Sequence, residues 1–516
     1  MFGRKGKEYI WLKSEAGKRF LTDIEHVYGG DRRYLSNVFA ALAKKDTYTT
    51  EKAAEALCIC LYEMTFDEIV TTDAMMRDST SIEWFVDWKN IKLGDLMIGT
   101  LSSDERRAIV IFASFHPNGF IREQAVTLMA HYPNTLSFLI LRTNDWVLQV
   151  RQATRMSIDA KMSILSDGEL VTALPFLEKM RRGKRSKHDY DVRYFYDKLM
   201  DDRYKNDLEI GLCSSNHFTR KLCIDAMICA GSPEAHKILA CLKREPVPFT
   251  RYVLYKKLLN FDFFQKDEIL RRMLGDKYPK VRMIAFLAME GDRYDVALKL
   301  LSDRSVGIRA LARDYIKKVN SAFDFRQFYI DALPANTYAS ICGIGEVGDK
   351  SDANLIQGYW HNESPSLIKA GMRACLRLDR CKYQPIVIRM ISDERSGISK
   401  QAYKLTKDYI TDYNEIHELF CTAVCKHSRQ RYADILMLAL KWQRLIYIIE
   451  LLSDIEEDIQ NLAKRNFADW LGNFNRSYTS PSKGQIAEIL ELLETNGHLI
   501  PRNVRAEVDF VLKIYK

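Results

Sequence analysis

Basic residues recur four positions apart in several segments of this chain. In a helix, this spacing places two side chains one turn apart on the same face, where like charges repel by on the order of a few tenths of a kcal/mol. The repetition therefore predicts a counter-charge, which is either acidic residues of neighbouring elements or an anionic partner such as a nucleic-acid backbone or an acidic protein surface. The residues are Arg151 and Arg155, Arg309 and Arg313 with Lys317, Lys369 and Arg373 with Arg377, and Lys400 with Lys404.

A second concentration of positive charge lies in residues 180–189, MRRGKRSKHD. The extra chain length here and Gly183 predict an exposed loop. The loop acts either as a solvated connector or as a contact that grips phosphate or an acidic patch. Its candidate binding residues are Arg181, Arg182, Lys184, Arg185 and Lys187.

Motifs for catalysis are missing from the sequence. It has no GxxxxGK[ST] phosphate loop and no GxSxG nucleophile motif, and GIGEVGDK at 343–350 falls in a segment predicted to be helical. The nearest metal-binding pattern is FCTAVCKH, in which Cys421 and Cys425 are expected to share one helix face near His427. That face needs apolar residues in any case, so we predict no catalytic residue, no metal and no small-molecule cofactor.

The elements that carry the basic residues repeat with a period near thirty. A phrase with apolar residues before a basic residue, and at helical spacing after it, describes an amphipathic helix. Another apolar segment precedes each phrase, so each unit is predicted to be a helical hairpin. Most intervals between the basic residues are 27 to 31 residues, and two are 42 and 60. The marker residues are Arg122, Arg151, Arg193, Arg220, Arg251, Arg282, Arg309, Lys369, Lys400 and Arg431.

An acidic residue recurs six positions before several of these markers. It falls in the predicted turn between the two helices, where a carboxylate suits the exposed N–H groups and the positive dipole end of the second helix. The residues are Asp145, Glu245, Asp276, Asp303 and Glu363.

This combination of an acidic turn residue and a basic residue in the second helix resembles the HEAT repeat, and most closely the short bacterial HEAT-like units of phycobilisome lyases. The resemblance covers about residues 104–515 and implies an all-α fold, a right-handed α-α superhelix of about 11–13 helical hairpins. It also implies that the acidic and basic side chains form ladders between neighbouring repeats. The unit between Arg309 and Lys369 lacks the basic residue, so a local change in the ladder is expected there.

Residues 1–103 lack the repeating phrase but still have helical periodicity. We expect them to form an irregular helical cap on the solenoid of residues 104–516, or a separate partner-binding module. The aromatic cluster Trp84, Phe85 and Trp88 is expected in the core, and in the alternative it is the distinctive surface of the module.

Composition is consistent with a cytoplasmic protein. The 516 residues are 47% hydrophobic and 28% charged, with a formal net charge of +9. No apolar run follows the basic residues at the start and none is long enough to cross a bilayer, so neither a signal peptide nor membrane insertion is expected. Seven of the eleven cysteines lie in apolar helical phrases, which predicts buried free thiols rather than disulfides.

Three classes of function remain open from the sequence. The first is a non-catalytic scaffold or adaptor that binds another macromolecule, a protein, along its concave surface. The second is a solenoid that binds nucleic acid or another polyanion through the basic residues. The third is an enzyme related to the HEAT-like alkylpurine DNA glycosylases, for which Asp145 and Trp146 would be the candidates, although Asp145 occupies a turn position that is acidic in other units without a catalytic need.

Overall fold

The computed structural model describes residues 14–84, 86–180, 192–231, 235–261 and 265–515. Within these ranges every regular element is helical and no strand occurs, so the predicted all-α class is confirmed. No helix in the same ranges combines the length and the apolar character that crossing a membrane requires.

The contacts divide the chain into two compact units, residues 1–288 and 289–516. In the first unit, the α-helices are α2 (Glu15–Tyr28), α3 (Leu35–Ala41), α4 (Thr47–Glu63), α5 (Phe66–Asp78), α6 (Ser103–Ala113), α7 (Gly119–Met129), α8 (Leu136–Arg142), α9 (Leu148–Lys161), α10 (Glu169–Met180), α11 (Val192–Leu199), α12 (Lys205–Leu212), α13 (His217–Cys229), α14 (Ala235–Arg244), α15 (Pro248–Leu258), α16 (Lys266–Leu274) and α17 (Pro279–Ala288).

In the second unit, the α-helices are α18 (Tyr294–Leu300), α19 (Val306–Val319), α20 (Phe325–Asp331), α21 (Thr337–Val347), α22 (Asp352–Gln357), α23 (Pro365–Leu378), α24 (Arg380–Arg389), α25 (Ser396–Thr406), α26 (Tyr413–Thr422), α27 (Lys426–Leu436), α28 (Lys441–Leu451), α29 (Glu457–Gly472), α30 (Lys483–Asn496) and α31 (Arg502–Lys513).

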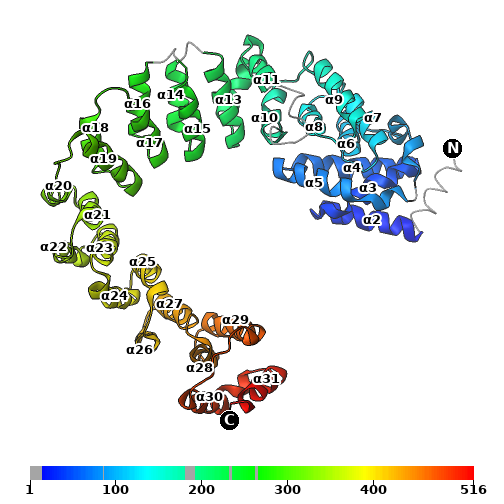
Figure 1. The fold of residues 1–516 in the computed structure, drawn as a ribbon. Coiled ribbons are helices and arrows are strands. Elements are labelled where there is room, and N and C mark those ends of the chain that lie inside the picture. The colour runs from blue at the N-terminus through cyan, green and yellow to red at the C-terminus, as the bar shows by residue number, and fades with distance from the viewer. Residues whose placement is uncertain (1–13, 85, 181–191, 232–234, 262–264, 516) are drawn as a thin grey trace. The chain divides into compact units, whose positions relative to one another are not determined.

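Helices in the first unit pack as consecutive hairpins. The second helices of the hairpins lie side by side, as α13, α15 and α17 do in Figure 1, and their contacts follow the same order. Each second helix buries apolar side chains at helical spacing, as Leu254 and Leu258 of α15 illustrate. The predicted hairpin periodicity is therefore present in this unit.

The first hundred residues are helical, as expected, and α4 packs along α6, the first helix of the predicted repeat region. A boundary at residue 103 stays a prediction. Within the aromatic cluster, Trp88 is buried and its indole N–H donates to the carbonyl of Ile82 at 2.9 Å, whereas Trp84 is 75% exposed. Phe85 lies outside the described residues. The expectation of a core position is thus confirmed for Trp88 and wrong for Trp84.

The second unit is a similar succession, in which α21, α23, α25, α27 and α29 contact one another in order. Two glycines of the 343–350 segment allow neighbouring helices to approach α21 closely. A Cβ at Gly343 would lie 2.3 Å from the ring of Tyr329, and one at Gly345 would lie 2.6 Å from the Cβ of Ala374. These glycines let α21 pack tightly against α20 and α23, and the segment forms a helix rather than a phosphate loop.

Candidate functional site

A turn of constant geometry connects the two helices of most hairpins. The side chain of the turn residue accepts a hydrogen bond from the backbone N–H two residues later, over 2.7 to 3.2 Å. This bond satisfies an N–H group near the start of the second helix, as the sequence predicted for a carboxylate. The turn residues are His116, Asp145, Ser214, Glu245, Asp276, Asp303, Asn362, Asp393 and Asp454.

Six residues after the turn residue, an arginine returns to the same turn. Its Nη1 donates to the turn residue's carbonyl oxygen over 2.6 to 2.9 Å. After Asp454, Gln460 makes the equivalent bond at 2.7 Å. The arginines are Arg122, Arg151, Arg220, Arg251, Arg282 and Arg309.

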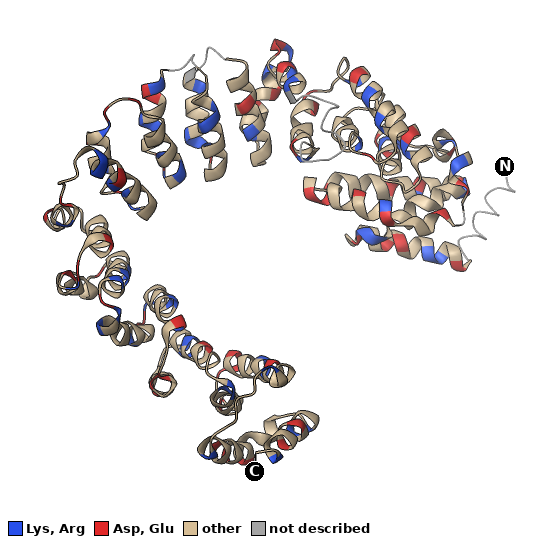
Figure 2. Cartoon of the chain, in the orientation of Figure 1, with Lys and Arg blue, Asp and Glu red and all other residues tan. Residues whose placement is uncertain are grey.

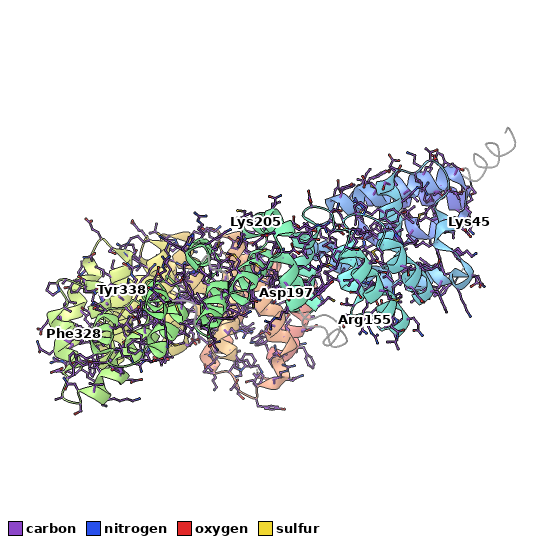
Figure 3. The ribbon with its side chains drawn as sticks, turned by 90° about the horizontal axis from the view of Figure 1, so that it is seen from above. Lys45, Arg155, Asp197, Lys205, Phe328 and Tyr338 are labelled. Carbon is purple, nitrogen blue, oxygen red and sulfur yellow. The ribbon has the colours of Figure 1, made fainter. Side chains whose placement is uncertain are left out.

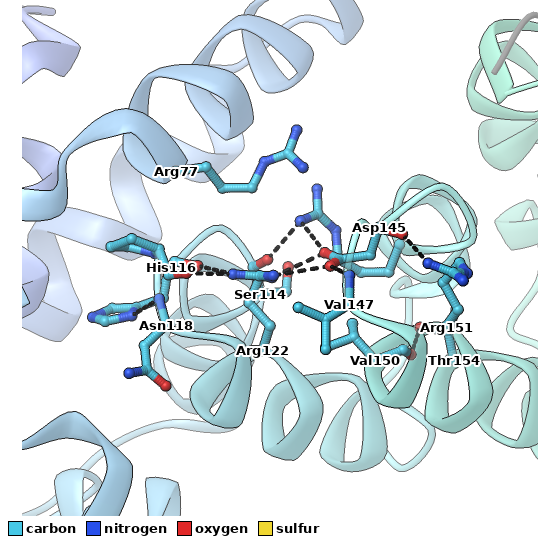
Figure 4. A network of polar contacts seen from close by, with 12 residues as sticks. Arg77, Ser114, His116, Asn118, Arg122, Asp145, Val147, Val150, Arg151 and Thr154 are labelled. Atoms are coloured by element: carbon cyan, nitrogen blue, oxygen red, sulfur yellow. Dashed lines mark hydrogen bonds and ion pairs between the residues drawn. The ribbon is translucent and has the colours of Figure 1, made fainter. Parts of the chain in front are cut away.

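In Arg122, Arg220 and Arg251 the other two nitrogens reach the turn of the next hairpin. Nε and Nη2 of Arg122 donate to the two carboxylate oxygens of Asp145, each at 2.9 Å (Figure 4). Arg220 binds Glu245 and Arg251 binds Asp276 in the same bidentate way, over 2.8 to 2.9 Å. One guanidinium group therefore ties together two consecutive turns, a geometry that suits its planar fork.

The ladder changes in the unit that lacks the basic marker, as predicted. Arg309 binds Glu346 of α21 instead of a turn residue, with its Nε 3.2 Å from the carboxylate. Arg313, a predicted binding residue, donates to the same carboxylate at 2.6 Å. Arg313 thus shares an acidic partner with Arg309 inside the protein.

The most buried part of the ladder carries an excess of positive charge. Arg142 contacts both Asp145 and Asp73, and Asp73 is also 3.0 Å from Arg77, so three arginines share two aspartates. Burial lowers the pKa of Arg77. Burial of Asp145 by itself opposes ionisation, but hydrogen bonds from Arg122 and the charges of the arginines lower the pKa of its carboxyl group overall.

This network gives Asp145 a structural role. Its carboxylate is 0% exposed and accepts bonds from Arg122, Arg142 and the backbone N–H of Val147. Trp146, which is 49% exposed, lies over the guanidinium of Arg122 with 4.7 Å to the ring centroid. Neither oxygen of Asp145 faces an open surface on which a nucleotide could bind.

The sequence alignment of the later markers is wrong in register. Counted from the turn residue, the ladder position is the sixth residue, which is Ile368 after Asn362 and Ser399 after Asp393. Lys369 and Lys400 are the seventh. At the last marker, Arg429 rather than Arg431 reaches the next turn, with Nη2 2.6 Å from Asp454. Counting back six residues fails at Lys369 and Lys400 because Ile368 and Ser399 occupy the position that holds arginine in other units. It fails at Arg431 because Arg429 makes the contact with the next turn.

The corrected register brings five basic residues to equivalent places on two adjacent helices. Lys369, Arg373 and Arg377 are the seventh, eleventh and fifteenth residues after Asn362, and Lys400 and Lys404 are the seventh and eleventh after Asp393. Because α23 and α25 contact each other, equal positions place these side chains on one surface. We call this set, Lys369, Arg373, Arg377, Lys400 and Lys404, the α23–α25 basic face.

Contacts within the protein leave most of this face unpaired. Arg373, Arg377, Lys400 and Lys404 are exposed, and neither α23 nor α25 contains an acidic residue. Arg373 donates to the hydroxyl of Tyr338, labelled in Figure 3, over 3.4 Å. The Nζ of Lys369 lies against the first turn of α25, where a Cβ at Gly397 would be 2.9 Å away. No ion pair within the described ranges involves any of the five.

The remaining predicted binding residues lie on other helices or outside the described residues. Arg151 donates to the carbonyl of Asp145, and Arg155 is part-buried on α9 (Figure 3), in the other unit. Lys317 is exposed near the end of α19. The predicted loop residues lie outside the described residues: Arg181, Arg182, Lys184, Arg185 and Lys187.

The predicted cysteine pair is separated in the structure. α26 ends at Thr422, and Cys425 is the extended residue that precedes α27, so Cys421 and Cys425 do not share a helix face. His427 instead has its Nε2 3.0 Å from the carbonyl oxygen of Asp393. All eleven cysteines are free thiols; Cys60, Cys223 and Cys375 are buried as expected, whereas Cys421 is exposed.

Neither a family model nor a curated protein matches the chain.

Proposed function

We propose that the chain is a non-catalytic HEAT-like solenoid that acts as a scaffold and binds an acidic surface of another protein through the α23–α25 basic face. The observation that carries the proposal is the alignment of five basic residues at equivalent positions of two adjacent helices that contain no acidic residue. Like charges placed so close together destabilise the free protein slightly, and an anionic partner would remove that cost.

The recurring turn and its arginine support the HEAT-like assignment. Arg122, Arg220 and Arg251 each join one turn to the next through a guanidinium group, and hairpins that contact their neighbours in this way are typical of a solenoid. The buried side chains of the ladder bind one another, so the exposed residues of the second helices are the ones available to a partner.

A protein partner suits this surface better than a nucleic acid. Other second helices of the unit carry acidic residues, Asp314 on α19 and Asp434 on α27, and α27 contacts α25. Acidic and basic residues are interspersed along the helices of each unit (Figure 2). A duplex presents a continuous row of phosphates, which calls for a long positive track. A short positive face limited to two helices instead matches a local acidic patch on a protein.

The test is charge reversal of the face. The variant Arg373→Glu, Arg377→Glu, Lys400→Glu, Lys404→Glu is compared with a control of the same charge change at exposed residues elsewhere in the second unit: Arg476→Glu, Lys483→Glu, Arg502→Glu, Lys513→Glu. Fluorescence anisotropy with labelled poly-glutamate should show affinity at least about tenfold weaker for the first variant only, and weaker binding by the wild type as salt rises.

A labelled DNA duplex in the same assay distinguishes a nucleic-acid partner from a protein partner. If the wild type binds the duplex more tightly than poly-glutamate and only the first variant loses that binding, the result would indicate a nucleic-acid partner in place of a protein partner. Equal binding of poly-glutamate by both variants would remove the face from the proposal.

A further inference from the structure

A histidine, a thiol and a carboxylate from two helices converge in the second unit, away from the basic face. His417 and Cys421 lie four residues apart on α26, and Glu450 lies on α28. The Nε2 of His417 is 2.8 Å from Oε1 of Glu450 and 3.7 Å from Sγ of Cys421. One donor atom from each residue lies within 4.8 Å of the other two.

The surrounding helices hold these three side chains in place. Buried Ile416 and Phe420 anchor α26, and α28 is buried along most of its length. The imidazole of His417 stacks on the ring of Tyr447, with centroids 5.4 Å apart. The side chains of His417 and Glu450 are 30% and 33% exposed and Cys421 is exposed, so an ion could enter from solvent.

The donor set fits a zinc-class divalent cation. Imidazole nitrogen, thiolate sulfur and carboxylate oxygen are the ligands that zinc takes in proteins, usually in a tetrahedron. With Zn–N and Zn–S bonds of about 2.0 and 2.3 Å, tetrahedral geometry places N and S about 3.5 Å apart. The observed separation is 3.7 Å. The N–O distance has to lengthen to about 3.3 Å when an ion replaces the shared proton.

We propose that His417, Cys421 and Glu450 bind one zinc-class ion, which links α26 to α28 and leaves a fourth position for water. Binding releases the thiol proton and the proton held between the imidazole and the carboxylate. The charges of Glu418 and Glu488, which act on His417, make the pocket negative and favour a cation.

Cobalt substitution in the full chain tests the proposal. The reduced, metal-free protein should take up one Co²⁺ per chain and show a thiolate-to-cobalt charge-transfer band with the strong visible bands of a four-coordinate ion. Cys421→Ser should abolish the charge-transfer band. Glu450→Gln, which keeps the side-chain volume, should weaken Zn²⁺ affinity at least about tenfold in competition with a chelator.

Matched controls keep the outcome decisive. Cys381→Ser removes another exposed thiol and His498→Ala another exposed imidazole, and both should leave the spectrum and the affinity unchanged. Zn²⁺ should raise the melting temperature of the wild type and of both controls, but not of Cys421→Ser. A wild type without the charge-transfer band, or a band that Cys381→Ser removes as fully as Cys421→Ser, would overturn the proposal.

Discussion

Arg122, Arg220 and Arg251 each satisfy three acceptor atoms. In Arg122, one nitrogen binds the carbonyl oxygen of its own turn and the other two bind the carboxylate of the next turn, all with no exposure to solvent. Removal of Arg122 would leave this buried carbonyl oxygen and the carboxylate of Asp145 without these donors, which costs more than the pair itself contributes. Contacts with the two turns therefore explain why an arginine stands at this position, and no ligand is needed to explain it.

Arg122→Ala should accordingly lower the free energy of unfolding by about 3–5 kcal/mol, because Asp145 loses its bidentate partner in the interior. Urea denaturation followed by circular dichroism measures the change. Arg377→Ala is the control, since this exposed residue has no ion pair within the described ranges and should change stability by less than about 0.5 kcal/mol. Similar losses in both variants would contradict the structural role of the ladder.

His116 makes the first ladder turn sensitive to pH. Burial and then the charge of Arg122 lower the pKa of its imidazole to about 3, and the neutral Nδ1 accepts the N–H of Asn118. In the unfolded chain a histidine titrates near about 6.5, so between these values the unfolded state binds a proton that the folded state does not. Stability from this residue is therefore present above pH 6.5 and is lost as the pH falls.

His116→Asn keeps a side-chain acceptor but removes the titration. Compared with the wild type, the variant should lose less stability on acidification below about pH 6.5, with a difference of up to about 1.4 kcal/mol per pH unit. Urea unfolding at several pH values between 4.5 and 7.5 measures both slopes, a range chosen to cover about two units below the free pKa. Parallel slopes for the two proteins would show that His116 is protonated in the folded state.

Helix packing in the second unit depends on residues that sequence motifs misassign. Gly343 and Gly345 look like part of a phosphate loop, yet they lie in α21 where Tyr329 and Ala374 leave no room for a Cβ. The pattern of apolar residues could predict the helices, because burial of one face produces it directly. It could not predict which helix approaches α21 so closely, since that depends on contacts between distant parts of the chain.

Gly345→Ala should therefore destabilise the protein by about 1–3 kcal/mol, because the backbone of α23 cannot move away from the new methyl group without repacking. Gly358→Ala, at an open position that follows α22, is the matched control and should be neutral or stabilising by up to about 1 kcal/mol. Thermal unfolding of the two variants distinguishes the outcomes, and an unchanged Gly345→Ala protein would mean that α21 and α23 are less tightly packed.

The candidate site shows which contacts of the basic residues cannot be predicted from the sequence alone. The four-residue spacing of Arg373, Arg377, Lys400 and Lys404 predicted a counter-charge, either on a neighbouring element or on an anionic partner, and these residues do share a face. Arg313 has the same spacing, but it binds Glu346 from a helix 33 residues away in sequence. Spacing along one helix reports which side chains are neighbours in that helix, and it carries no information about the charges that a later helix brings.

At the scale of the whole molecule, the chain contains two compact units, each with buried residues of its own. Stability in repeat proteins is a sum over neighbours, so separate units need not unfold together. We expect differential scanning calorimetry to resolve two transitions. Arg122→Ala should lower only the transition of the first unit, and Gly345→Ala only that of the second; one cooperative transition displaced by both variants would contradict this independence.

Because Arg220, Arg251 and Arg282 each follow a turn residue by six positions, a whole hairpin can be removed from the chain without changing this spacing. Removal of residues 246–276 would join Glu245 to Lys277, so that the second residue after Glu245 is Tyr278 and the sixth is Arg282. Arg220 would still meet Glu245, and Arg282 would find the same carbonyl that Arg251 uses now. A whole hairpin can thus be lost or duplicated in one recombination event while the arginines at the junction keep their partners, whereas an insertion between a turn residue and the arginine six positions later breaks this spacing. Gene lineages of such a protein should vary in repeat number more readily than in the spacing between turn residue and arginine.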